Sequence, residues 1–87
     1  KPGRGAGTAL ITELEKIARK HGCRLISLIT TNDNLSALGF YQRRGFHLAA
    51  LFPDQVTESR LIKPGIPEVG DNGIPIRDEL RLEKILV

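Results

Sequence analysis

The 87-residue sequence contains no tryptophan, no methionine, a single cysteine and only four aromatic residues, one tyrosine and three phenylalanines. A lone Cys23 cannot form an internal disulfide, and no cluster of cysteine and histidine has the spacing of a zinc site. No apolar run approaches the roughly 20 residues of a membrane-spanning helix, and no signal peptide is visible. We therefore expect a cytoplasmic protein that binds no metal and contacts no membrane. The absence of methionine also predicts that an N-terminal portion precedes Lys1 in the natural protein.

Charge is unevenly distributed along the chain. Residues 1–45 carry eight basic and three acidic side chains, whereas residues 46–87 carry five basic and seven acidic ones. The positive excess in the first half suits an anionic ligand. A nucleic acid is disfavoured, because aromatic side chains do not alternate with the basic ones. With 40% hydrophobic and 26% charged residues, the composition is that of one small soluble domain spanning residues 1–87.

The first half of the chain alternates between helical and strand patterns. Apolar residues recur on one face from Thr8 to about Lys20, which predicts a helix that Gly22 ends in a left-handed conformation. Branched apolar residues at 23–31 predict a strand that is covered on both faces. A second, short helix is expected at 35–43.

Polar residues and a glycine delimit this second helix. Asn32 or Asp33 can cap its beginning, and Gly45 is expected to stop it. The next residues, 46–52, have the apolar character of a second strand.

The stretch 53–77 has a different character, because four of the five prolines and three glycines lie in it. Its length predicts a long loop of the kind that forms a lid or a binding loop, with one or two helical turns in DQVTESRLI and a tight turn in GDNGIP. In ELRLEKILV, Leu80 and Leu82 alternate with charged residues, which predicts a third strand with one wetter face. The order of elements predicts an α/β (α+β) fold in which helices cover the faces of a mixed sheet.

Three glycines, Gly3, Gly5 and Gly7, stand in the stretch GRGAGTAL directly before the first predicted helix. Because glycine has no side-chain oxygen to cap the helix, the first backbone N–H groups remain available to an external acceptor. The positive end of the helix dipole, together with Arg4, favours a phosphate or another anion there. A plain turn is the alternative. The stretch lacks the lysine of a Walker loop and the third glycine of a dinucleotide-binding fingerprint.

Six positions at fixed offsets in NLSALGFYQRRGF form a second pattern: Asn34, Ala37, Phe40, Tyr41, Gly45 and Phe46. Together with GRGAGTAL, this stretch resembles the GCN5-related N-acetyltransferase (GNAT) family. That family has an acetyl-coenzyme A loop of the form Q/R-x-x-G-x-G/A before a long helix, and the later pattern N-x-x-A-x-x-F-Y-x-x-x-G-F. Pro2 stands where the family prefers Gln or Arg. The resemblance runs from the first residue to about Phe52 and implies the C-terminal part of one such domain, without its N-terminal strands.

The resemblance implies roles for individual residues. Backbone N–H groups of the glycine-rich stretch would hold the pyrophosphate of acetyl-coenzyme A, those of Arg4, Gly5, Ala6, Gly7 and Thr8. Asn34 would hydrogen-bond the cofactor. Tyr41 would contact it and act as the general acid that protonates the departing thiolate. From the residues alone two alternatives stay open: Asn34 is only a helix cap, and Tyr41 packs with Phe40 against the sheet.

The reaction that the resemblance implies is acetyl transfer from acetyl-coenzyme A to a primary amine of a small-molecule or peptide acceptor. The amine attacks the thioester directly, and no metal takes part. The oxyanion donor and the base would lie upstream, so the 87 residues alone are expected to be inactive. The alternative is a non-catalytic coenzyme A or nucleotide-binding module, or a truncated remnant that forms a homo-oligomer through an exposed sheet edge.

Several other polar residues are weaker candidates. Arg43 and Arg44 are expected on a solvated face, with the 3′-phosphate of coenzyme A as their alternative partner. Arg60, Lys63 and Arg77 are candidates for recognising an acidic acceptor. Three residues are expected to take no part in catalysis, namely Cys23, His21 and His47.

Overall fold

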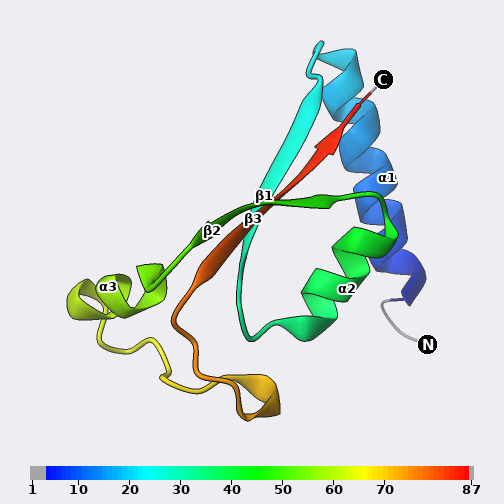
Figure 1. The fold of residues 1–87 in the computed structure, drawn as a ribbon. Coiled ribbons are helices and arrows are strands. Elements are labelled where there is room, and N and C mark those ends of the chain that lie inside the picture. The colour runs from blue at the N-terminus through cyan, green and yellow to red at the C-terminus, as the bar shows by residue number, and fades with distance from the viewer. Residues whose placement is uncertain (1–3, 87) are drawn as a thin grey trace. The chain divides into compact units, whose positions relative to one another are not determined.

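A computed structural model describes residues 4–86 of the chain (Figure 1). The elements follow in the order α1 (Arg4–Lys20), β1 (Leu25–Thr31), α2 (Leu35–Arg43), β2 (His47–Phe52), α3 (Gln55–Ile62), the 3₁₀ turn η1 (Asp71–Gly73) and β3 (Glu79–Ile85). The strands form one sheet in the order β1–β3–β2, and β2 pairs antiparallel with β3. The structure confirms the predicted α/β fold class.

The chain divides into two compact units. The first contains the described residues 4–26 and 84–86, and the second contains residues 27–83. In the first unit the buried apolar side chains are Ile11, Ile26 and Leu86. In the second they are Phe46, Val56 and Leu82, and Leu82 is fully buried in the middle of β3.

Helix α1 begins at Arg4, four residues before the predicted start at Thr8. Gly5 and Gly7 therefore lie in its first turn rather than in a loop before it. The physical reason is that the first N–H groups of a helix have no intrahelical partner, so glycine there sacrifices no side-chain cap and adapts to the helical backbone. Pro2 and Gly3, which complete the predicted loop, lie outside the described residues.

The end of α1 agrees with the prediction. Gly22 has a φ of 76° and donates its N–H to the carbonyl of Arg19 at 3.0 Å, while the N–H of Cys23 bonds the carbonyl of Ala18 at 2.9 Å. This pair of bonds is the Schellman arrangement, which satisfies carbonyls that the last helical turn leaves open. The basic residues Arg19 and Lys20 lie in that turn, where the helix dipole favours them.

A cluster of charges joins α1 to the end of β3 within the first unit. The Glu15 carboxylate lies 2.7 Å from Nζ of Lys84 and 3.6 Å from Nη2 of Arg19, and only 14% of the Glu15 side chain is exposed. On the exposed face of the same helix, Glu13 and Lys16 are 4.0 Å apart. The shielded Glu15 pair therefore contributes more to stability than the exposed one.

In the second unit the β2–β3 ladder runs from His47 opposite Glu83 to Phe52 opposite Glu79. Its register shifts between Leu48 and Ala50, which marks a β-bulge. A bulge adds local twist to a strand pair and redirects the residues beyond it.

The stretch 53–77 is more ordered than a long loop. It contains α3, which agrees with the expected one or two helical turns, and η1, which lies in the expected turn. Asp54 precedes α3 with a φ of 58°, and its N–H donates to Oδ1 of Asp78 at 2.8 Å. None of the helices in residues 4–86 combines the length and the apolar character that crossing a membrane requires.

Candidate functional site

The predicted phosphate-binding turn is the beginning of α1, in the first unit. The chain from Arg4 through Gly7 is helical, and the first turn contains no acidic residue. The open N–H groups of such a turn and the positive end of a 17-residue helix dipole suit an anion. Thr8 is exposed in the next part of the helix, and its carbonyl accepts a hydrogen bond from Oγ1 of Thr12 at 3.0 Å.

Asn34 is the N-cap of α2, in the second unit. Its Oδ1 accepts a hydrogen bond from the N–H of Ala37 at 3.2 Å. The prediction that Asn32 or Asp33 caps this helix was therefore wrong, because each of those side chains has another partner. The cap uses the Asn34 oxygen and leaves the Nδ2 group of this exposed residue directed to other acceptors.

Tyr41 lies near the end of α2, half-buried between two other rings. Its ring meets Phe40 edge-on at 5.4 Å between centroids and meets Phe46 at 5.6 Å. Edge-to-face aromatic pairs of this kind fix the plane of a ring. The Tyr41 hydroxyl makes no hydrogen bond within residues 4–86. The ring is therefore held by packing while its oxygen is left for an external partner.

The turn after α2 holds this aromatic cluster in place. Gly45 has a φ of 93°, which a residue with a side chain adopts only with strain, and so ends the helix as predicted. The N–H of Phe46 bonds the carbonyl of Tyr41 at 3.1 Å. This bond ties the buried Phe46 ring to the tyrosine, which explains why a glycine and a phenylalanine follow the tyrosine at these offsets.

The structure brings some of the predicted site residues together. Asn34 and Tyr41 are seven residues apart on one helix, close to two full turns, so they lie on the same side of α2 about 10 Å apart along its axis. The turn at Arg4 belongs to the first unit and these two residues belong to the second.

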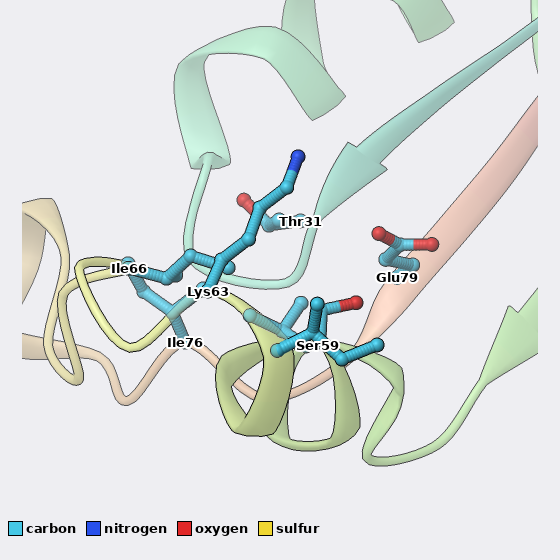
Figure 2. Close-up of a pocket in the computed structure, with 8 residues that line it drawn as sticks. Thr31, Ser59, Lys63, Ile66, Ile76 and Glu79 are labelled. Carbon is cyan, nitrogen blue, oxygen red and sulfur yellow. The ribbon is translucent and has the colours of Figure 1, made fainter.

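The second unit also contains a cavity that the sequence did not predict, with a volume of about 440 Å³ (Figure 2). Its lining residues come from the end of β1, one face of α3, the loop beyond α3 and the start of β3: Thr31, Val56, Ser59, Ile62, Lys63, Ile66, Ile76 and Glu79. Cavities of this size hold small molecules. Figure 2 shows Lys63 and Glu79 as separate charged groups on different elements around this space.

Arg60 fixes one wall of the cavity. Its guanidinium donates to the carbonyls of Ile66 at 3.1 Å, Pro67 at 2.7 Å and Ile76 at 2.8 Å. Ile66 and Ile76 both line the cavity, so Arg60 holds the backbone of two wall residues without lining the cavity itself. The planar guanidinium suits this task, because its donors are arranged as a rigid fork.

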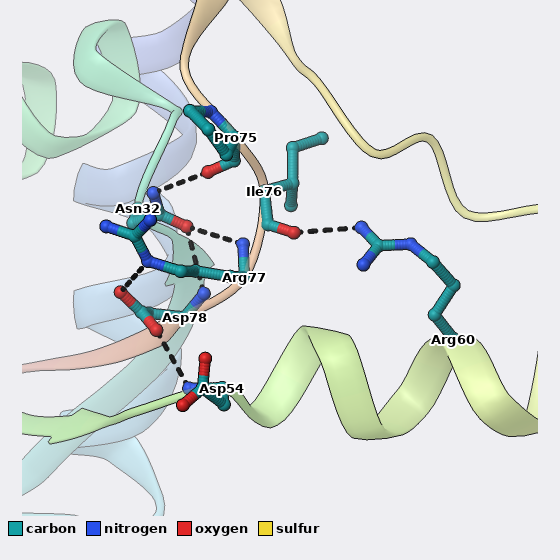
Figure 3. Close-up of polar contacts among 7 residues, drawn as sticks. All are labelled: Asn32, Asp54, Arg60, Pro75, Ile76, Arg77 and Asp78. Atoms are coloured by element: carbon teal, nitrogen blue, oxygen red, sulfur yellow. Dashed lines mark hydrogen bonds and ion pairs between the residues drawn. The ribbon is translucent and has the colours of Figure 1, made fainter.

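Asn32 ties the same loop to the end of β1 (Figure 3). Its Nδ2 donates to the carbonyl of Pro75 at 2.8 Å, and its Oδ1 accepts from the N–H groups of Arg77 and Asp78, both at 3.0 Å. Asp78 in turn accepts from the N–H of Asp54, before α3. The whole segment between β2 and β3 is thus fastened at several points.

The remaining basic candidates are engaged within the protein. Arg44 lies over the Phe40 ring, 3.6 Å from its centroid, and donates to the Phe40 carbonyl at 3.0 Å. Arg77 pairs with the neighbouring Asp78 at 3.3 Å. The sequence hypothesis for an acidic acceptor named Arg60, Lys63 and Arg77, and of these only Lys63 lines the cavity. Residues 4–86 contain no group of three or more metal-ligating side chains.

These features agree with the comparison to known proteins. The chain belongs to the acetyltransferase (GNAT) family, whose model matches residues 3–46, about half of the sequence. The uncharacterized protein YdhI of Bacillus subtilis (strain 168) is 51% identical over 83 residues, which are 95% of this chain and 52% of YdhI. The chain spans about half the length of the curated relatives it matches.

Solved structures show the same fold. An IAA acetyltransferase from Bacillus cereus superimposes with a TM-score of 0.81 at 29% identity, over 98% of this chain and 53% of that one. A Bacillus subtilis acetyltransferase in complex with coenzyme A superimposes with a TM-score of 0.80 at 28% identity, over 99% of this chain and 53% of that one. The predicted family is therefore confirmed.

Sequence reasoning found Lys63 but missed Thr31, Ser59 and Glu79. One signal was present. Val56, Ser59 and Lys63 are spaced by three and four residues, so a firm assignment of a helix at 55–62 places them on one face. Thr31 and Glu79 carry no local signal, because only the sheet brings them near that face.

Proposed function

We propose that this chain is the coenzyme-binding part of an N-acetyltransferase that moves an acetyl group from acetyl-coenzyme A to a primary amine. Membership of the GNAT family and the likeness to an acetyltransferase that was solved with coenzyme A support this proposal. The single observation that carries it is the setting of Tyr41, whose ring is clamped by Phe40 and Phe46 while its hydroxyl is without a partner in the described chain.

The residues present fit the coenzyme. The start of α1, Arg4, Gly5, Ala6, Gly7 and Thr8, offers backbone N–H groups and no carboxylate to the pyrophosphate. Asn34 keeps its amide donors for the coenzyme while its oxygen caps α2. When bound, acetyl-coenzyme A supplies an acetyl group activated as a thioester.

Tyr41 supplies the proton that the leaving sulfur needs. The neutral amine forms a C–N bond to the acetyl carbon, the C–S bond breaks, and the sulfur takes the phenolic proton. The amine loses one proton in the same turnover, and that proton restores the phenol through solvent. The products are an N-acetylated amine and a free thiol, so atoms and charges balance without a metal ion.

Two measurements test the proposal. Calorimetry with coenzyme A measures binding to this chain, and release of free thiol from acetyl-coenzyme A in the presence of amines measures transfer by the protein as its gene encodes it. We expect Tyr41→Phe to keep the affinity for coenzyme A, because the ring packing is unchanged, and to slow transfer by about 10²- to 10⁴-fold, as for a lost general acid.

The control keeps the hydroxyl and changes its neighbour. Phe40→Leu removes one ring contact of Tyr41, so transfer should fall far less than in Tyr41→Phe. An unchanged rate in Tyr41→Phe removes Tyr41 from the mechanism. Binding of coenzyme A without transfer to any amine identifies the non-catalytic binding module instead, and no binding at all refutes the proposal.

A further inference from the structure

The cavity of the second unit contains two opposite charges without partners. Lys63 is exposed at the end of α3 and Glu79 is half-buried at the start of β3. Neither side chain makes an ion pair or a hydrogen bond within residues 4–86, and the two do not pair with each other. A half-buried carboxylate beside apolar side chains is costly unless something pairs with it. The arrangement therefore points to a cationic group of a ligand at Glu79.

The rest of the lining is aliphatic. Val56, Ile62, Ile66 and Ile76 contribute branched apolar side chains, and no aromatic ring lines the cavity. The hydroxyl of Ser59 has no hydrogen-bond partner in the described chain, whereas that of Thr31 donates to Asp33. These walls fit a branched aliphatic group and offer no surface for stacking a planar ring.

We propose that this cavity binds an aliphatic amino acid as its zwitterion. The ammonium group pairs with Glu79, the carboxylate pairs with Lys63, and the side chain lies among the four aliphatic residues. A ligand with one charge satisfies one of the two residues and places its apolar body next to the other, unpaired charge. A zwitterion satisfies both and brings no net charge into the site.

The cavity is prepared for such a ligand before binding. Arg60 holds the carbonyls of Ile66 and Ile76, and Asn32 holds the chain on both sides of Ile76. Because the walls are fastened by the protein itself, a small ligand orders few groups when it binds, which lowers the entropic cost.

If the acetyltransferase function is correct, this amino acid is the acceptor; the assignment of that role rests on the proposed function, whereas the binding site does not. Acetylation replaces one N–H bond of the α-amine with an N–C bond to the acetyl group. The product amide carries no positive charge and so loses its pairing with Glu79. The site therefore favours the substrate over the product, which assists release.

The experiment is calorimetric titration of the chain, without acetyl-coenzyme A, with four matched probes. Leucine carries both charges, 3-methylbutylamine only the cation, 4-methylpentanoate only the anion, and N-acetyl-leucine is the product. We expect leucine to bind at least about tenfold more tightly than each of the other three, as the loss of a charged partner predicts.

Variants locate the site. Glu79→Gln and Lys63→Met should each weaken leucine binding about 10- to 100-fold. Glu79→Gln should leave the affinity for 4-methylpentanoate unchanged, a readout that general unfolding does not give. The matched controls Glu68→Gln and Lys20→Met change exposed side chains outside the cavity lining and should bind leucine as the unaltered chain does.

The outcomes separate this proposal from the acetyltransferase function. No leucine binding, equal binding of all four probes, or full binding by Glu79→Gln overturns the site, even where coenzyme A binds normally. Leucine binding that depends on Glu79 and Lys63 supports the site, even where coenzyme A does not bind and the acetyltransferase proposal fails. Formation of N-acetyl-leucine from acetyl-coenzyme A, reduced in Glu79→Gln, supports the acceptor role, and its absence from an active enzyme overturns that role.

Discussion

Replacing Arg60 with methionine tests whether one side chain holds the segment between β2 and β3 in its folded form. Methionine keeps much of the aliphatic stem and removes the guanidinium with its three bonds to the carbonyls of Ile66, Pro67 and Ile76. Two of these bonds are part-buried and one is exposed, so each contributes about 1 kcal/mol rather than the higher values of fully buried charged bonds. We expect Arg60→Met to lower the free energy of unfolding by about 3 kcal/mol.

That loss is large for a chain of this size, whose total stability is roughly 4–13 kcal/mol. Urea unfolding followed by circular dichroism should show the midpoint falling by about 1–3 M. Arg60→Lys keeps the charge but not the rigid fork of donors, so it should lose part of this stability and not all. Leucine binding should weaken in Arg60→Met as well, because Ile66 and Ile76 line the cavity.

Arg77→Met is the matched control. Arg77 lies in the same segment, but its side chain is 56% exposed and its one charged partner is the neighbouring Asp78. Removing such a surface pair costs below about 1 kcal/mol. Equal unfolding midpoints for Arg60→Met and Arg77→Met would show that the three carbonyl bonds add nothing to stability, and the reasoning would then be refuted.

Two further predictions each have a control within the chain. In Gly70→Ala the new Cβ lies 2.7 Å from Cγ of the buried Asp33, so we expect a loss of about 1–3 kcal/mol in urea unfolding, whereas Gly65→Ala meets open space and should change stability by less than about 1 kcal/mol. Glu15→Gln removes a shielded 2.7 Å ion pair with β3 and should lower the melting temperature measurably, by about 1–2 kcal/mol of stability, while Glu13→Gln, in an exposed 4.0 Å pair, should not. A destabilised Gly65→Ala or Glu13→Gln would contradict the respective argument.

The elements of the first half were predictable because their signals are local. The apolar stripe of α1, the glycines at 22 and 45 and the branched run of β1 each specify a conformation within a few residues. The start of α1 was placed too late, since glycine was taken as a loop signal. In the first turn of a helix glycine breaks no hydrogen bond, so the signal is ambiguous there.

The identity of the cap of α2 could not be read from the sequence TNDN. Asn32, Asp33 and Asn34 can all cap a helix, and the local sequence does not choose among them. The choice depends on partners far along the chain: Asn32 bonds Pro75, Arg77 and Asp78. Only Asn34 is left for the cap, and this consequence of tertiary structure lies beyond any local rule.

The two parts of the proposed site differ in how they are encoded. The part for the coenzyme uses backbone N–H groups and one packed tyrosine, which require fixed spacings within short stretches and so produce recognisable motifs. The cavity is built from side chains at 31, 56–66 and 76–79, which the sheet and the bonds of Arg60 and Asn32 bring together. Such a lining produces no motif, because each residue can change without disturbing a neighbour in sequence. Exchanges at Lys63 or Glu79 should therefore alter which ligand the cavity accepts while leaving the motifs of α1 and α2 intact.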